Sequence, residues 1–345
     1  MKKPIRQAQG NKPKILILFC GGTIVMVKTK EGILDMASKE EAVKNLLNLE
    51  PRIREIADIE VEYIDNIDST NITAKHWDRI SKTIAKKYDE YDGFVITHGT
   101  NTMAYTASAL SFTLQNLGKP VVLTGSQIPG DQIETDARRN FVNAVRLATM
   151  DVSGVYVVFD EEVILGSRAS KVSESKLDAF ETINWDDAGE IRLEIKLSDE
   201  VKKRHNRPIN LQTGFDDNIA VITLFPQMNP KTLQAALHKK VSGVILRGYG
   251  AGGISYAYLD ILEKLKKRKV PVVVSTQCME GATLMHMDDV GTKALNAGVI
   301  QAHDMSIECT VVKLMWALKR GPYGSIKELV HHNYTGEINV EGKIY

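Results

Sequence analysis

Hydroxyl and amide side chains follow the ends of the predicted strands in the first half of the chain, where they could act on a polar ligand. They lie in residues 20–24, 68–71, 97–103 and 124–129. Because the carboxyl ends of parallel strands form the ligand-binding edge of an open α/β sheet, we expect these segments to meet at one edge. They carry little charge, which suits a neutral small molecule. A nucleotide phosphate is disfavoured, because the chain has no GxxxxGK[ST] loop.

Three side chains in and near these segments could make and break a covalent bond. Gly21 and Gly22 permit a tight turn with the Thr23 hydroxyl at its tip. Thr100 lies in a segment with three threonines, a histidine and an amide, which is more than a helix cap requires. A threonine needs a base to become a good nucleophile, and Lys171, in the turn-like segment 166–171, is the candidate. Taken alone, Thr23 could equally be part of a turn or cap, and Lys171 a solvated loop residue.

The sequence predicts no cofactor and no metal. Residues 248–253 match GxGxxG, but the next predicted strand ends in Ser-Thr-Gln and lacks the acidic residue that a dinucleotide ribose requires. The eight histidines show no HExxH or paired metal spacing. The three cysteines form no CxxC pair, which fits a reducing compartment and argues against a disulfide framework.

Short apolar runs alternate with helical patterns from residue 14 onward, which is typical of parallel βαβ units buried on both faces. We predict two α/β domains: a larger N-terminal one with a mostly parallel sheet flanked by helices, and a smaller C-terminal parallel α/β domain. The predicted strands are 15–19, 61–67, 93–97, 121–124 and 155–159, then 219–224, 241–246 and 270–275. The predicted helices are 40–49, 74–87, 104–117 and 136–150, then 231–239, 256–267 and a C-terminal pair.

The polar stretch 196–218 lacks apolar periodicity and is the predicted linker. It joins an N-terminal domain, 1–204, whose strand core begins at about residue 14, to a C-terminal domain, 218–345. The chain carries 44 Lys plus Arg and 43 Asp plus Glu, a net charge of +1, so we expect neither a nucleic acid nor a membrane as partner. No apolar run is long enough for a signal peptide or a membrane span, and a cytoplasmic protein is expected.

Several segments together resemble the bacterial-type L-asparaginase family, and most closely its cytoplasmic type I branch. They are GGTI, THGTNTMAYTASAL, PVVLTGSQIP and RASK in the first half, and ILRGYG, STQCM and NYTGEI in the second. The resemblance implies a two-domain amidohydrolase that splits the small-molecule amide L-asparagine into aspartate and ammonia without a cofactor. It also implies a homodimer or homotetramer.

The resemblance assigns roles to particular residues. Thr23 looks like the nucleophilic threonine, and Thr100 with Lys171 looks like the threonine and lysine that assist proton transfer. Ser69, with Thr70 beside it, looks like a ligand of the substrate carboxylate. The cytoplasmic branch has a second, allosteric asparagine site, and its matching positions here are Ser170, Arg247 and Cys278.

Three positions depart from the family pattern. The family motif HGTDT reads HGTNT here, so Asn101 replaces the aspartate expected to bind the substrate α-ammonium. Losing a hydrogen bond to a charged group typically costs ~1.5–3 kcal/mol, or roughly ten- to hundredfold in the use of free asparagine. Ile33 stands where the mobile first loop usually has a tyrosine, and Gly253 where the second domain often has an asparagine.

Three functions are compatible with this pattern. The first is a working amidohydrolase with weakened or altered specificity, favoured because Thr23, Thr100 and Lys171 are all present. The second is a catalytically impaired relative that serves as a binding or regulatory protein. The third is a tRNA-dependent amidotransferase subunit of the same fold. It is disfavoured because that subunit normally has an additional N-terminal domain, whereas about a dozen residues precede the first predicted strand here.

Overall fold

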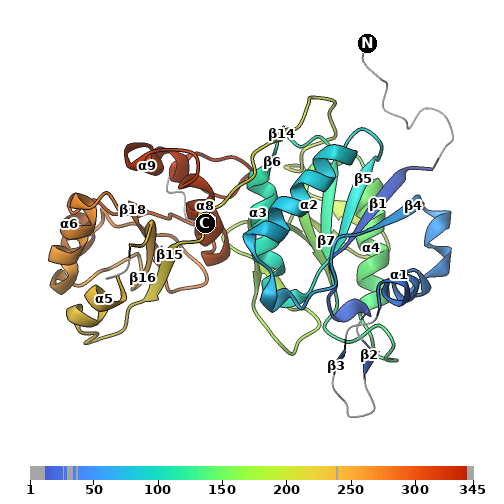
Figure 1. Cartoon of the computed structure of the whole chain (residues 1–345), viewed down its shortest axis with the longest axis horizontal. Helices are drawn as coiled ribbons and strands as arrows, with labels where there is room; N and C mark the ends of the chain where they lie inside the picture. Colours follow the sequence, from blue (N-terminus) through green and yellow to red (C-terminus); the bar gives the residue numbers. More distant parts are fainter. Residues whose placement is uncertain (1–11, 26, 29–33, 36–37, 238–239, 340–345) are drawn as a thin grey trace. The chain divides into compact units, whose positions relative to one another are not determined.

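The structure is a computed structural model that describes residues 12–25, 27–28, 34–35, 38–237 and 240–339. The chain divides into two compact units, Met1–Thr213 and Gly214–Tyr345, which we call unit 1 and unit 2 (Figure 1). Each unit has its own sheet and its own apolar core. None of the described helices is both long enough and apolar enough to cross a membrane.

Unit 1 is built on an eight-stranded sheet in the order β13-β12-β9-β8-β7-β5-β1-β4. Five neighbouring strands of this sheet, β8, β7, β5, β1 and β4, run parallel to one another. Strands β9, β12 and β13 extend the sheet beyond β8, each antiparallel to its neighbour. The parallel strands are β1 (Lys14–Phe19), β4 (Asp58–Tyr63), β5 (Gly93–Thr97), β7 (Pro120–Thr124) and β8 (Gly154–Phe159). The antiparallel ones are β9 (Glu162–Leu165), β12 (Gly189–Ile191) and β13 (Ile195–Leu197).

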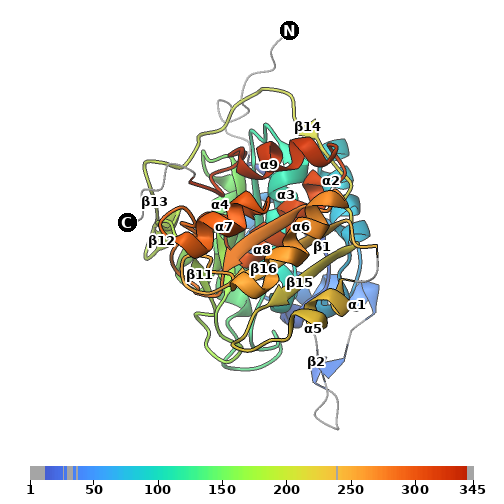
Figure 2. The same ribbon diagram turned by 90° about the vertical axis from the view of Figure 1, so that its left-hand side faces the viewer.

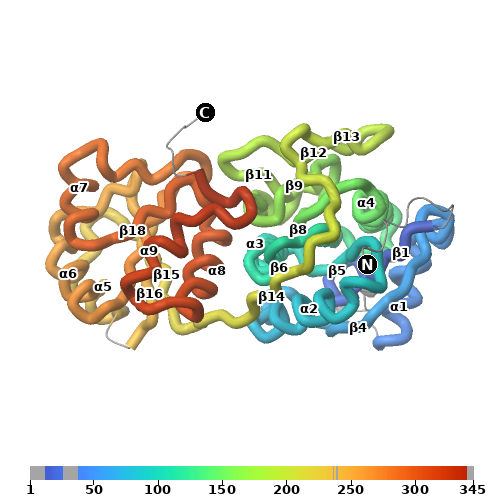
Figure 3. Tube along the Cα trace, turned by 90° about the horizontal axis from the view of Figure 1, so that it is seen from above, coloured from blue at the N-terminus to red at the C-terminus, as the bar shows by residue number. Residues whose placement is uncertain are grey.

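Helices cover both faces of this sheet, as Figure 3 shows from above. Along β1, Ile15, Ile17 and Phe19 belong to the core packed under α1 (Lys39–Asn48) and α4 (Ala137–Thr149). The alternate residues Leu16 and Leu18 belong to the core under α2 (Ala74–Lys87) and α3 (Met103–Thr113). Successive strand residues point to opposite faces, so continuous apolar strands fill two cores at once.

Shorter elements complete unit 1. They are β2 (Val27–Lys28), β3 (Leu34–Asp35), η3 (Pro51–Glu55), β6 (Leu114–Gln115), β10 (Ala169–Lys171), β11 (Phe180–Thr182) and β14 (Asn210–Leu211). β10 pairs antiparallel with β11, β6 with β14, and β2 with β3.

Unit 2 has a four-stranded parallel sheet in the order β15-β16-β17-β18. Its strands β15 and β16 are labelled in Figure 2. The strands are β15 (Ile219–Thr223), β16 (Gly243–Gly248), β17 (Val272–Thr276) and β18 (Ile300–Gln301). The helices are α5 (Pro230–Ala236), η6 (Tyr256–Tyr258), α6 (Leu259–Lys267), α7 (Asp289–Asn296), α8 (Ile307–Ala317) and α9 (Tyr323–His331). Lys313 and Glu337 form a fully buried ion pair with 2.7 Å between Nζ and Oε1. Three donors from Tyr334 and Thr335 also reach Glu337, so the buried carboxylate is fully engaged.

The predicted fold class of two α/β domains is confirmed, and some local predictions were wrong. The second strand, expected at 61–67, is Asp58–Tyr63, because charged Asp58 and Glu60 on an edge strand interrupt the apolar run that marks a strand in sequence. The chain leaves the sheet at once, since the N–H groups of residues 64 and 65 both donate to Phe19 O. Lys171 lies on strand β10 rather than in a turn. The stretch expected as a linker, 196–218, includes the boundary between the two units after Thr213, and it also contains the short strand β14, which pairs with β6.

Candidate active site

The four polar segments meet at the carboxyl ends of β1, β4, β5 and β7, and glycines allow their close approach. Gly22, at φ +100°, lies so near the third segment that an added Cβ would be 2.7 Å from Gly99 N. A Cβ on Gly99 would be 2.7 Å from Ser69 Oγ, and one on Gly125 would collide with His98 O. Any side chain at these glycines would separate the segments, so the glycines hold the edge together.

Thr23 is the first residue of the short helix η2 (Thr23–Val25) and is half-buried. It follows Gly22, which packs against residues 98–99. Thr100 begins the short helix η5 (Thr100–Thr102) directly after that contact and is buried. Each threonine therefore lies one residue after the contact between Gly22 and Gly99, on a different strand end.

Lys171 reaches from β10 to the third segment and contacts two of its side chains. Its Nζ donates to Thr100 Oγ1 at 2.7 Å and to Asn101 Oδ1 at 3.0 Å. Burial lowers the pKa of Lys171, an effect that Glu174 partly opposes. A lysine with a lowered pKa that donates to a threonine hydroxyl can, once deprotonated, accept that hydroxyl's proton by reversing the hydrogen bond.

Gln127 is a site residue to which the sequence reasoning assigned no role. Its Oε1 accepts a hydrogen bond from Thr100 Oγ1 at 3.1 Å, while its Nε2 donates to Glu174 O and Lys176 O, both at 3.0 Å. Both backbone carbonyls follow β10, so one amide connects Thr100 to the chain beyond Lys171. The signal was present in the fourth segment, TGSQIP, whose only long polar side chain is this glutamine.

Asp136 fixes the loop that carries Gln127. Its carboxylate accepts hydrogen bonds from the backbone N–H groups of Gln127 and Ile128 and from Asn140 Nδ2 at 2.9 to 3.1 Å. The same Nδ2 of Asn140 donates to Gly125 O. A buried carboxylate with several donors is well satisfied, and here it holds the turn after β7 in one conformation.

His98 is buried beneath the third segment, and its neighbours determine its tautomer. His98 Nδ1 lies 2.7 Å from Gly99 O, and a carbonyl oxygen only accepts, so Nδ1 carries the proton of the neutral ring. His98 Nε2 then accepts a hydrogen bond from the Thr106 hydroxyl, 2.8 Å away, which itself accepts from Trp77 Nε1. Burial lowers the pKa of His98 to about 4, so the ring is neutral near pH 7. It positions the Gly99 backbone next to Thr100.

The predicted carboxylate ligands differ in exposure. Ser69 begins the short helix η4 (Ser69–Asn71), is 2% exposed, and touches Gly99 at the strand-end cluster. Its carbonyl accepts from Thr102 Oγ1 at 2.7 Å. Thr70 is exposed, and its N–H is capped by Asp68. Ser69 therefore lies in the buried part of the cluster, whereas Thr70 is exposed outside it.

The predicted allosteric residues are divided between the two units. Ser170 is on β10 in unit 1, next to Lys171. Arg247 and Cys278 are in unit 2, where Arg247 Nη2 donates to the carbonyl of Gln277 at 3.3 Å and so lies beside exposed Cys278. Both belong to the carboxyl ends of the parallel strands β16 and β17.

Two further residues depart from the family pattern: Gly253, in a small turn of unit 2, and Ile33. Gly253 pairs with Tyr249 through hydrogen bonds in both directions, at 2.7 and 3.0 Å. An added Cβ there would come no closer than 3.4 Å to any atom, so a larger side chain fits. Ile33 lies outside the described residues.

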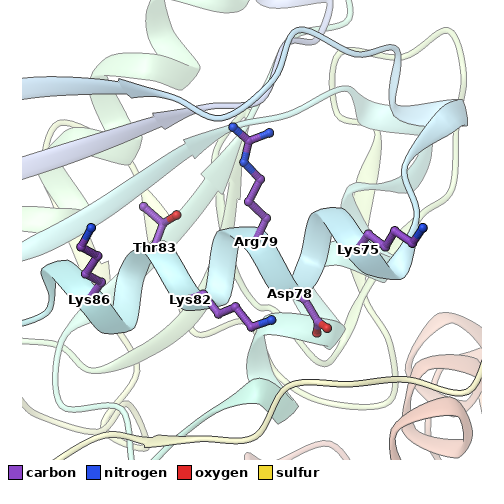
Figure 4. Close-up of a pocket in the computed structure, with 6 residues that line it drawn as sticks. All are labelled: Lys75, Asp78, Arg79, Lys82, Thr83 and Lys86. Carbon is purple, nitrogen blue, oxygen red and sulfur yellow. The ribbon is translucent and has the colours of Figure 1, made fainter.

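A shallow hollow on the outer face of α2 is separate from this cluster. Figure 4 shows the side chains that line it projecting from the helix. They are Lys75, Asp78, Arg79, Lys82, Thr83 and Lys86. None belongs to the four polar segments, and four are basic, whereas the strand-end cluster is composed of hydroxyls, amides and one lysine. Within the described residues, no group of His, Cys, Asp and Glu could hold a metal ion.

Two family models match the chain: "Asparaginase, N-terminal" over residues 14–203, and "Glutaminase/Asparaginase C-terminal domain" over residues 218–330. The chain belongs to the asparaginase family. The resemblance drawn from the sequence is thereby confirmed, and the protein is a hydrolase of asparaginase type.

Individual relatives cover almost the whole chain. It is 40% identical to the L-asparaginase of Thermococcus kodakarensis over 94% of this chain and 99% of that protein, whose structure superimposes with a TM-score of 0.87. It is 34% identical to L-asparaginase 1 of Escherichia coli, over 95% and 98%. It is also 32% identical to a glutamyl-tRNA(Gln) amidotransferase subunit of Pyrococcus abyssi, over 94% of this chain and 77% of that protein.

Proposed function

We propose that this asparaginase-family protein hydrolyses the side-chain amide of L-asparagine or of a closely related β-amide. The observation that carries the proposal is the 2.7 Å hydrogen bond between Lys171 Nζ and Thr100 Oγ1 at the strand ends where Thr23 also lies. Titratable groups with shifted pKa values, clustered with hydroxyls at the edge of a parallel sheet, are the usual signature of an acyl-transfer site.

In the first step, Thr23 Oγ1 attacks the amide carbon and the carbonyl oxygen becomes an oxyanion. Backbone N–H groups of the converging loops are the donors available to stabilise that charge. Collapse of the tetrahedral intermediate re-forms the carbonyl and breaks the C–N bond; the departing nitrogen takes the proton that the Thr23 hydroxyl lost, so ammonia leaves and an acyl ester remains on Thr23. Water then attacks the ester, and Lys171 in its neutral form, through Thr100, accepts the proton of that water. When the ester C–O bond breaks, this proton returns to Thr23 Oγ1 and the acid product is released.

Ser69 anchors the substrate carboxylate in this proposal, at the buried end of η4. The resemblance supports that role, as does its contact with Gly99, the residue before Thr100.

The protein is proposed to act in the cytoplasm as a homodimer or homotetramer. Its three cysteines are unpaired by disulfides, which fits a reducing compartment. Sedimentation of the purified chain measures the assembly.

The decisive measurement is ammonia release from L-asparagine, L-glutamine and N-acetyl-L-asparagine by the parent, Thr23→Ala and Lys171→Met. Each substitution is expected to reduce the rate by at least about a thousandfold, because it removes a member of one catalytic unit. Lys176→Met, which changes an exposed lysine on the same loop, is the matched control and should retain parent activity. Full activity of Thr23→Ala would exclude Thr23 as the nucleophile.

The impaired-relative hypothesis makes the opposite forecast. If the parent releases no ammonia from any amide and Asn101→Asp restores none, the protein is not an amidohydrolase and a binding role replaces the proposal.

The allosteric site is tested by the shape of the rate curve. We expect a sigmoidal dependence on asparagine that Arg247→Ala makes hyperbolic, and a curve that is hyperbolic in both proteins would exclude that site.

A further inference from the structure

The orientation of the Asn101 amide is determined by the hydrogen bonds around it. Gln127 Nε2 donates to two backbone carbonyls, so its Oε1 is the atom that accepts from the Thr100 hydroxyl. With its own proton given to Gln127, Thr100 Oγ1 accepts from Lys171. The Lys171 Nζ also donates to Asn101, which must present its oxygen at 3.0 Å. The carbonyl of the amide therefore faces the lysine.

This arrangement leaves the Asn101 Nδ2 group directed away from Lys171 with two N–H donors. No described residue accepts a hydrogen bond from it, and the side chain is exposed next to the catalytic threonine and lysine. A carboxylate at this position could accept from Lys171 with one oxygen and from a substrate ammonium with the other. An amide cannot do both, because its second polar atom only donates.

The charges nearby act in the same direction. The Asn101 side chain is neutral, so it adds no negative charge beside Lys171. The only carboxylate among the described residues that acts appreciably on Lys171 is Glu174, on the loop beyond β10. A substrate ammonium beside Asn101 would meet two N–H donors and, behind them, a lysine that is positive whenever it is protonated. Unmatched donors and like charges both disfavour binding of a cation.

We propose that Asn101 selects β-amide substrates whose C2 substituent is a neutral hydrogen-bond acceptor, such as an acylated nitrogen or a hydroxyl, in place of an ammonium. The inference rests on the proposed function, because it concerns the same site and the same cleavage. In this geometry the Nδ2 group donates to the substituent oxygen, Lys171 keeps its bond to Oδ1, and Ser69 holds the C1 carboxylate.

The experiment compares kcat/KM for L-asparagine, N-acetyl-L-asparagine and L-malamate, the 2-hydroxy analogue, in the parent, Asn101→Asp and Asn206→Asp. In the parent, at least one acceptor-bearing amide should be used about ten- to hundredfold better than asparagine. Asn101→Asp should reverse the preference by a similar factor. Asn206→Asp, an exposed change of unit 1 outside the four polar segments that adds the same charge, should leave the ratios as they are in the parent.

The outcomes are distinguishable from failure of the proposed function. If the parent prefers asparagine and Asn101→Asp does not change the ratios, the substrate class is wrong while amide hydrolysis stands. If no amide yields ammonia in either protein, both are wrong. Product inhibition tests the same inference in the parent alone. N-acetyl-L-aspartate or L-malate should inhibit more strongly than L-aspartate, and the reverse order would overturn the inference. Stronger inhibition by N-acetyl-L-aspartate identifies an acyl oxygen as the preferred acceptor, and stronger inhibition by L-malate identifies a hydroxyl.

Discussion

Replacing His98 with glutamine should make unit 1 less sensitive to acid. The folded ring is neutral with a pKa lowered to about 4 by burial, whereas an unfolded histidine has a pKa near 6.5. Between these values the unfolded chain binds a proton that the folded one excludes, so stability falls as the pH drops below about 6.5. For a single such histidine, going from about pH 7 to about pH 5 costs roughly 2 kcal/mol of unfolding free energy.

His98→Gln keeps an amide donor and acceptor near Gly99 and Thr106 but cannot titrate. Its absolute stability at neutral pH will be lower, since the fit to the two hydrogen bonds is poorer. The informative quantity is the loss of stability between the two pH values, which should be about 2 kcal/mol smaller than in the parent. Hydrogen exchange of the β5 amides at both pH values reports unit 1 directly.

The matched control is His286→Gln, an exposed histidine of unit 2, which should leave the acid sensitivity of the β5 amides at the parent level. Equal acid sensitivity in the parent and His98→Gln would refute the reasoning. It would mean that the buried ring either takes up a proton in the folded state or is not excluded from solvent, and the tautomer that positions Gly99 would then be wrong as well.

Three further outcomes follow from the contacts. Because burial lowers the pKa of Lys171, amide hydrolysis should rise with pH along a limb set by this lysine, and Asn101→Asp should move that limb to higher pH; an unmoved limb means another base. Gln127→Met should lower kcat by about tenfold with little change in KM, as one net hydrogen bond to the reacting pair is lost. Lys313→Met strands buried Glu337 and should cost ~3–5 kcal/mol of unit 2 stability in urea unfolding, whereas a loss under about 1 kcal/mol would contradict the buried pair.

Local patterns were sufficient for much of the fold. The strand Gly93–Thr97 and the helix Ala74–Lys87 have the predicted bounds, because the strand is a continuous apolar run, the helix has a clear period, and both have clear end signals. The short antiparallel strands β9, β12 and β13 were not predicted, since they are three or four residues long and half of their residues are not fully buried. Their pairing is a property of the sheet edge that a local window does not contain.

The candidate site shows the same limit more sharply. Strand ends placed Thr23, Ser69 and Thr100 at one edge from topology alone. The contact between Lys171 and Thr100 spans 71 residues, so neither spacing nor composition indicates it. From the residues alone Lys171 was a candidate base that could equally be a solvated loop lysine, and the family resemblance paired it with Thr100. The role of Gln127 was missed for a related reason, although the residue lies in the fourth polar segment. Its role depends on three partners from two other segments, and a glutamine in a polar turn is ordinary by itself.

Asn101 links substrate choice to the strength of the base. A carboxylate at that position would stabilise the protonated form of Lys171 and raise its pKa, so the family aspartate that binds an ammonium also makes the lysine a poorer proton acceptor near neutral pH. An amide reverses both effects: asparagine loses its partner, and Lys171 becomes neutral at lower pH. The two consequences separate experimentally, because loss of the substrate contact raises KM at every pH, whereas the change in the base moves the pH limb of kcat. A variant that restores asparagine affinity should therefore need a higher pH to reach its maximal rate.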